Sequence, residues 1–148
     1  MKIELLPPRL YQAFIVLMIL SHSIFPIYEL IPKPYRFGGI IIFIVGAWFA
    51  IRAKRLFKQT QTPMNPSAKP TQLHKLGFFR ISRNPMYLGI TAGLFGIAIF
   101  LGTIMTFVFP ILFLLIMNYE FVPVEEQKLE SVFGEEFRQY RNEVRRWI

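Results

Sequence analysis

A long stretch without any charged residue, from Asn84 to Tyr119, sets the strongest limit on how this chain folds. As one helix rising about 1.5 Å per residue, it would be about 54 Å long, whereas the hydrocarbon core of a bilayer is about 30 Å thick. The stretch therefore predicts two apolar helices of roughly 17 residues, each long enough to cross a membrane. We expect the turn between them at Leu101-Gly102-Thr103, because glycine favours tight turns.

Two further apolar blocks precede this hairpin, one from about Leu10 to Ile31 and one from about Phe37 to Ile51. Charged residues make up only 18% of the chain, whereas a soluble domain carries about 25%. The sequence thus predicts an all-α integral membrane protein with about four transmembrane helices in a single domain, residues 1–148. Residues 1–53 would form the first two spans, and residues 54–148 a long loop, the helical hairpin and a C-terminal helix.

Three glycines recur along the third expected span, at Gly89, Gly93 and Gly96. Small residues on one face let membrane helices approach each other closely. We therefore expect this face to pack against another helix rather than to take part in chemistry.

Residues able to bind a metal ion are scarce, because the chain has no cysteine and only two histidines, His22 and His74. The absence of cysteine excludes disulfides, thiolate ligands and a cysteine nucleophile. Two histidines alone are a poor basis for a metal centre. We predict no metal site.

Positive charge is concentrated in two parts of the chain, which has a formal net charge of +8. Cytoplasmic loops of membrane proteins carry an excess of Lys and Arg, so both termini and the central loop are expected to be cytoplasmic. We expect membrane lipid, not nucleic acid, as the partner of this charge. The basic residues are Arg52, Lys54, Arg55, Lys58, Lys69, Lys75, Arg80 and Arg83 in the loop, and Lys128, Arg138, Arg141, Arg145 and Arg146 in the tail.

The C-terminal tail has the pattern of an amphipathic helix that begins near Pro123, a residue tolerated in the first turn of a helix. A basic stripe of Arg138, Arg141 and Arg145 lies beside its apolar face. Such a helix typically lies on the surface of an anionic membrane. The apolar face consists of Leu129, Phe133, Phe137, Tyr140, Val144 and Trp147.

Arg83, Asn84 and Pro85 stand directly before the third span. Asn84 is a favoured N-cap and Pro85 a favoured first helical residue. The unpaired N–H groups of the first turn, with Arg83 beside them, would bind the carboxylate or phosphate of a soluble cofactor. The alternative is a capped span anchored in the membrane interface by Arg and Tyr side chains.

Two adjacent acidic residues, Glu125 and Glu126, follow the fourth span. A carboxylate at this place can accept hydrogen bonds from both hydroxyls of a ribose. Neighbouring residues on a helix point about 100° apart, so only one of them is expected to face a pocket. We expect Glu126, because it shares a face with Leu129 and Phe133. The alternative is that both glutamates stabilise the positive end of a helix dipole.

In order and spacing, the stretch from Gly77 to Gly89, the pair Glu125-Glu126 and the closing Val144-Arg145-Arg146-Trp147-Ile148 resemble the isoprenylcysteine carboxyl methyltransferase family. The resemblance is greatest to the family's short bacterial members, in which a stretch like Thr62-Pro63-Met64-Asn65-Pro66 precedes the cofactor motif. It covers about residues 60 to 148. It implies a bacterial plasma-membrane enzyme that uses S-adenosylmethionine.

The resemblance also implies roles for individual residues. Arg83, Asn84, Pro85 and Tyr87 would hold the methionine end of the cofactor, and Glu125 or Glu126 its ribose. Phe78 and Tyr140 are candidates for contact with the adenine or the sulfonium, since a ring face attracts a cation. Asn84 stands where the family often has histidine, so a role that needs a basic imidazole is in doubt. The full candidate set is Asn65, Gly77, Phe78, Arg83, Asn84, Pro85, Tyr87, Glu125, Glu126 and Tyr140.

The function expected from these features is methyl transfer from S-adenosylmethionine to a lipophilic or small-molecule acceptor at the cytoplasmic membrane face. The accepting group would be a carboxylate, thiol or amine, and no catalytic residue is named. Two alternatives stay open: a membrane reductase that uses NADPH, and a non-catalytic membrane scaffold of the same fold. Cofactor binding separates the three hypotheses.

Overall fold

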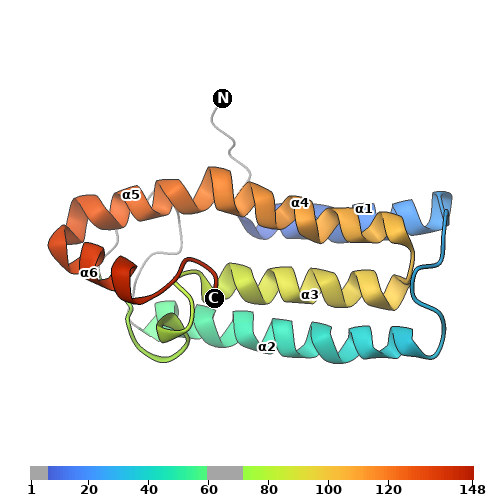
Figure 1. Cartoon of the computed structure of the whole chain (residues 1–148), viewed down its shortest axis with the longest axis horizontal. Coiled ribbons are helices and arrows are strands. Elements are labelled where there is room, and N and C mark those ends of the chain that lie inside the picture. Colours follow the sequence, from blue (N-terminus) through green and yellow to red (C-terminus); the bar gives the residue numbers. More distant parts are fainter. Residues whose placement is uncertain (1–6, 60–71) are drawn as a thin grey trace. The chain divides into compact units, whose positions relative to one another are not determined.

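The computed structural model describes residues 7–59 and 72–148 and is all-α, as the sequence predicted. Its chain divides into two compact units. The described part of the first unit comprises residues 7–48 and 89–115, and that of the second comprises residues 49–59, 72–88 and 116–148. The helices in Figure 1 are α1 (Pro7–Ile24), α2 (Gly38–Gln59), α3 (Pro85–Leu101), α4 (Val108–Ile116), α5 (Val122–Phe133) and α6 (Glu135–Glu143).

In the first unit, α2 and α3 lie side by side (Figure 1) and approach each other through glycines. A Cβ atom added to Gly46 would lie 2.5 Å from the backbone nitrogen of Gly93, and one added to Gly96 would lie 2.5 Å from that of Phe43. Both distances are too short for real atoms. The close packing predicted for this face of the third span is therefore confirmed at Gly96. On α2, Gly46 makes a similar close approach to Gly93.

The turn between α3 and the following helix is where the sequence placed it, because α3 ends at Leu101. Gly102 has a φ of +75°, which favours glycine. Its carbonyl accepts hydrogen bonds from the backbone nitrogens of Leu30 and Ile31, at 2.8 and 3.1 Å. The loop that follows α1 is thereby attached to the hairpin turn.

Arg36 strengthens this attachment. Its Nε donates to the carbonyl of Ile31 over 2.6 Å, and its Nη2 lies 2.8 Å from a carboxylate oxygen of Glu29. A Cβ on Gly102 would collide with the Arg36 guanidinium. Glycine is thus required at the turn both for its φ and for the space that Arg36 fills.

Among residues 7–59 and 72–148, two helical stretches are long and apolar enough to cross a membrane, Tyr35–Leu56 and Ile104–Phe133. Arg9–Ile24 and Pro85–Leu101 are shorter apolar helices. Ile41, Ile44 and Leu115 are among many large apolar side chains on these helices that stay exposed. An apolar surface of this kind fits contact with lipid, since soluble proteins seldom expose large apolar patches.

The ends of the first two helices differ from the ends of the apolar blocks expected from the sequence. The first helix ends at Ile24 instead of Ile31, and the second continues to Gln59, beyond Ile51. Pro26 stands just after the end of α1 and has no N–H to continue a helix.

The prediction of a single amphipathic helix in the C-terminal tail is wrong. The tail contains α5 and α6, which are separated by Gly134 at a φ of +51°. A positive φ interrupts a right-handed helix, and glycine adopts it without steric cost. Because α6 ends at Glu143, Val144 and Trp147 lie outside any helix. The expected helix start near Pro123 is confirmed, because α5 begins at Val122 with Pro123 in its first turn. It follows α4 through a π-helical turn, η4 (Met117–Phe121).

The glycine contact between α2 and α3 is testable with two Gly→Ala variants of α2. Gly46→Ala should lower the free energy of unfolding by about 1–3 kcal/mol, because the added methyl group meets backbone that cannot move aside. Gly38→Ala is the matched control, since no atom lies within 4 Å of its added Cβ. Thermal or denaturant unfolding in detergent micelles measures both. Equal stability of the two variants would contradict the contact.

Candidate functional site

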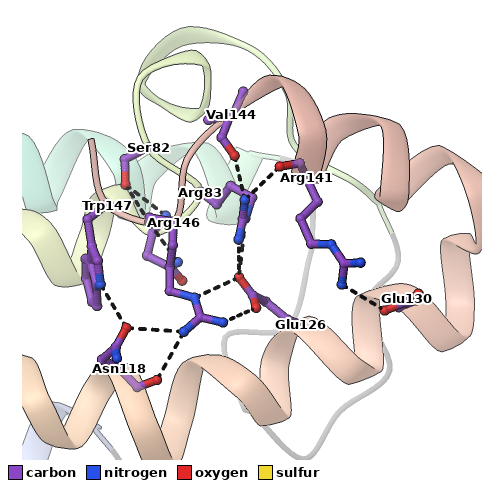
Figure 2. Close-up of polar contacts among 10 residues, drawn as sticks. Ser82, Arg83, Asn118, Glu126, Glu130, Arg141, Val144, Arg146 and Trp147 are labelled. Carbon is purple, nitrogen blue, oxygen red and sulfur yellow. Dashed lines mark hydrogen bonds and ion pairs between the residues drawn. The ribbon is translucent and has the colours of Figure 1, made fainter.

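Two stretches of sequence that were predicted to share a site meet in the second unit. Nη2 of Arg83 lies 2.7 Å from Oε1 of Glu126 (Figure 2). The hydroxyl of Tyr87 donates to Oε1 of Glu125 over 2.6 Å. Arg83 stands just before α3 and Tyr87 in its first turn, whereas both glutamates lie near the start of α5. The fold thus pairs each glutamate with one residue of the Arg83–Tyr87 stretch.

Glu126 is held by two arginines. Nε and Nη2 of Arg146 donate to its Oε1 and Oε2 over 3.2 and 2.6 Å, and Nε of Arg83 makes a further bond of 3.3 Å to Oε1. The side chains of Glu126 and Arg83 are only 12% and 10% exposed. Removing one partner from a buried ion pair of this kind typically costs about 3–5 kcal/mol, because a charge is left without compensation.

The end of the chain lies across Arg83. Nη1 of Arg83 donates to the carbonyls of Arg141 and Val144, at 3.0 and 2.5 Å. The backbone nitrogen of Arg83 donates to the carbonyl of Arg145 over 3.0 Å. Figure 2 shows these contacts between the segment before α3 and the residues at the end of α6 and beyond it. The Arg83 guanidinium therefore joins the tail to Glu126.

Asn84 stands where the sequence placed it, directly before Pro85, the first residue of α3. Its side-chain nitrogen donates to the carbonyl of Arg146 over 3.1 Å. The hydroxyl of Ser82 donates to the same carbonyl over 3.2 Å. Asn84 thus binds the tail in addition to marking the helix start, and Pro85 is fully buried beside it.

Tyr140 is a core residue of the second unit. It is 4% exposed and packs with Phe79 and Phe137. Its hydroxyl donates to the carbonyl of Phe79 over 2.7 Å. Burial raises the pKa of Tyr140 to about 12, so the hydroxyl stays protonated and acts as a donor. Contact between Tyr140 and a cofactor stays a prediction.

Gly77 and Phe78 lie in a short 3₁₀ turn, η2 (Gly77–Arg80). Gly77 has a φ of +62°, a conformation that favours glycine. The ring centroids of Phe78 and Phe49 are 4.4 Å apart. Asn65 lies outside the described residues.

The structure adds four residues to this site that the sequence analysis did not assign to it: Ser82, Asn118, Arg146 and Trp147. Arg146 and Trp147 belong to the closing motif, but their spacing alone does not indicate which residues they contact. Asn118 had a readable signal, because it is an amide near the end of an uncharged apolar stretch, where polar groups usually have a partner.

Comparison with known proteins places most of the chain in a family context. A family model described as phospholipid methyltransferase matches residues 35–136. A protein of Haemophilus influenzae, described only as uncharacterized, is 38% identical over 63 residues, which are 43% of this chain and the whole of that protein. No solved structure matches the chain.

The packing beneath the site gives a prediction for pH dependence. His74 is buried and its ring centroid lies 5.6 Å from that of Phe79. Burial lowers the pKa of His74 below its ordinary value of 6.5. The unfolded chain therefore takes up a proton that the folded protein does not, and stability falls as the pH drops below 6.5.

We expect the unfolding temperature in detergent to decline between pH 7 and pH 5, and to decline less in His74→Gln. Other acidic groups affect both proteins equally, so the difference between the two curves isolates His74. Parallel curves would contradict a buried neutral imidazole.

Proposed function

The chain belongs to the phospholipid methyltransferase family, whose model covers more than half of it, and we propose that it transfers a methyl group from S-adenosylmethionine to a lipid acceptor. This family is related to the isoprenylcysteine carboxyl methyltransferases, which the sequence resembles, and membership of that group stays a prediction. The observation that carries the proposal is the pairing of Arg83 with Glu126 and of Tyr87 with Glu125.

The chemistry of these side chains suits this cofactor, which family members use. It has a carboxylate at one end, a ribose with two hydroxyls and a positively charged sulfonium. The first turn of α3 carries backbone N–H groups without helical partners, next to Arg83, and these favour a carboxylate. A glutamate with acceptor positions left can accept hydrogen bonds from the ribose hydroxyls.

The geometry changes which glutamate is proposed for the ribose. A carboxylate has about four acceptor positions, and Glu126 already accepts bonds from Nε and Nη2 of both Arg83 and Arg146. Glu125 accepts one bond at Oε1, from Tyr87. We therefore assign the ribose to Glu125, in place of the Glu126 expected from helical spacing. Glu126 instead fixes the position of Arg83.

The bound cofactor supplies an electrophilic methyl group on a sulfonium. The chain's own contribution is to hold that group in line with the acceptor and to exclude water. The partly buried pair of Tyr87 and Glu125 orients the cofactor. The backbone N–H groups at the start of α3, beside the positive charge of Arg83, favour its carboxylate end. An acceptor that arrives as an anion needs no base, and we name none.

A lipid acceptor fits the apolar helices. Exposed isoleucines, leucines and phenylalanines on α1, α2 and α4 form surfaces that lipid chains can contact. We propose four transmembrane helices with both termini cytoplasmic, in accord with the positions of Lys and Arg. The cofactor would then enter from the cytoplasm, and the acceptor would reach it within the membrane.

Cofactor binding is the first test of this function. Purified protein in detergent should bind S-adenosylmethionine and S-adenosylhomocysteine in a calorimeter and should not bind NADPH. Glu125→Gln should weaken that binding by about 1.5–3 kcal/mol, the expected effect of losing a charged hydrogen bond. Glu126→Gln should chiefly lower the unfolding temperature, because Arg83 and Arg146 lose their charged partner.

Glu143→Gln is the matched control, since Glu143 is exposed on α6 and the same charge is removed. Nicotinamide binding without binding of the sulfonium cofactor would overturn the methyltransferase proposal in favour of a reductase. Binding of neither cofactor would favour a scaffold. If Glu125→Gln and Glu126→Gln both leave the affinity for the cofactor unchanged, the two glutamates have structural roles only.

The topology is tested by introducing single cysteines, because the native chain has none. In intact cells, Ser67→Cys and Ser131→Cys should be protected from a thiol reagent that cannot cross the membrane. Lys33→Cys, between the first two expected spans, should react and serves as the positive control. Labelling of Ser67→Cys from outside would invert the proposed orientation.

A further inference from the structure

Pro123 leaves a backbone carbonyl of the preceding turn without a helical partner. In the π-helical turn η4, the nitrogen of Val122 donates to the carbonyl of Met117, five residues earlier. The next carbonyl, that of Asn118, would in the same register require an N–H from residue 123. Proline has none. Irregular turns of this type often occur at functional sites.

Arg146 donates a hydrogen bond to this carbonyl. Its Nη1 lies 3.4 Å from the backbone oxygen of Asn118 and 3.2 Å from the side-chain oxygen. The same side-chain oxygen accepts a bond of 3.0 Å from the indole nitrogen of Trp147. Figure 2 shows Asn118 facing both residues of the tail. One asparagine thereby binds two consecutive residues near the end of the chain.

The contacts continue from Arg146 into the proposed cofactor site. The other two nitrogens of its guanidinium bind Glu126, and Glu126 binds Arg83. The carbonyl of Arg146 accepts bonds from Ser82 and Asn84. Asn118 therefore acts at one end of a connected series of hydrogen bonds whose other end is the segment before α3.

We propose that Asn118 is a positioning residue of the cofactor site, because it sets Arg146 and Trp147 so that Arg146 orients Glu126 and, through it, Arg83. This inference rests on the proposed function. An arginine side chain has many rotamers, and the side chain of Arg146 is 33% exposed. The two oxygens of Asn118 select the one orientation in which the remaining nitrogens face Glu126.

The experiment compares three variants of the full-length protein in detergent. Asn118→Ala removes the side-chain acceptor and should weaken S-adenosylhomocysteine binding about tenfold or more, the scale of a lost bond to a charged group. Asn118→Asp keeps an acceptor oxygen for both donors and should restore affinity to within about threefold of wild type. Asn142→Ala makes the same change at an exposed asparagine of α6 and should bind as wild type does.

A second readout does not depend on the cofactor. Trypsin cleaves after Arg145 and Arg146, and release of the tail should accelerate cleavage in Asn118→Ala but not in Asn118→Asp or Asn142→Ala. Mass spectrometry identifies the shortened chains. Trp147→Phe, which removes the indole N–H together with the five-membered ring, should show a smaller increase because Arg146 still binds Asn118. This variant covers the case in which Asn118→Ala does not fold.

The outcomes separate this inference from the proposed function. If wild-type protein binds S-adenosylhomocysteine and Asn118→Ala binds it equally well, the positioning role is wrong while the methyltransferase proposal stands. If Asn118→Asp fails to restore affinity, the side-chain oxygen is not the group that matters, and the inference is overturned. If wild type does not bind, the proposed function fails, whatever the cleavage rates show. The proposal is supported if Asn118→Ala shows both faster cleavage and weaker binding while Asn118→Asp and Asn142→Ala behave like wild type.

Discussion

The carboxylate of Glu126 between two guanidinium groups is the interaction on which the second unit depends. It joins the segment before α3, the start of α5 and the end of the chain, which are far apart in the sequence. Low exposure strengthens the attraction between the charges, and it also makes each of them costly to leave without a partner. Loss of Glu126 would leave the nearly buried guanidinium of Arg83 without an anionic partner.

This constraint explains why the candidate site combines residues with different tasks. Arg83 and Arg146 together fill the hydrogen-bonding capacity of Glu126, and the third nitrogen of Arg146 binds Asn118. Glu125 and Tyr87 form a smaller pair alongside them. In the proposed function, the larger cluster gives rigidity and the smaller pair gives contact with the cofactor. Binding geometry that is fixed before the ligand arrives loses less entropy on binding.

The first unit follows a different principle. Its helices have few polar groups, and α2 and α3 approach through glycines that leave no room for a methyl group. Where helices are surrounded by lipid, such close packing replaces the hydrophobic effect as the source of association. At the hairpin turn, Gly102 and Arg36 make hydrogen bonds to the backbone of the loop that follows α1. The family match and the apolar helices together indicate a membrane protein.

The sequence by itself determined the all-α class, the turn at Gly102, the start of α3 at Pro85 and the glycine face that packs, because each follows from local hydropathy or backbone chemistry. It also singled out Arg83, Tyr87, Glu125 and Glu126. It misjudged the tail, since the apolar spacing continues through Gly134 while the backbone does not. Only the tertiary structure decided that Glu126 binds Arg83 and Arg146 and that Asn118 holds the tail, because these contacts join residues that local sequence patterns cannot relate.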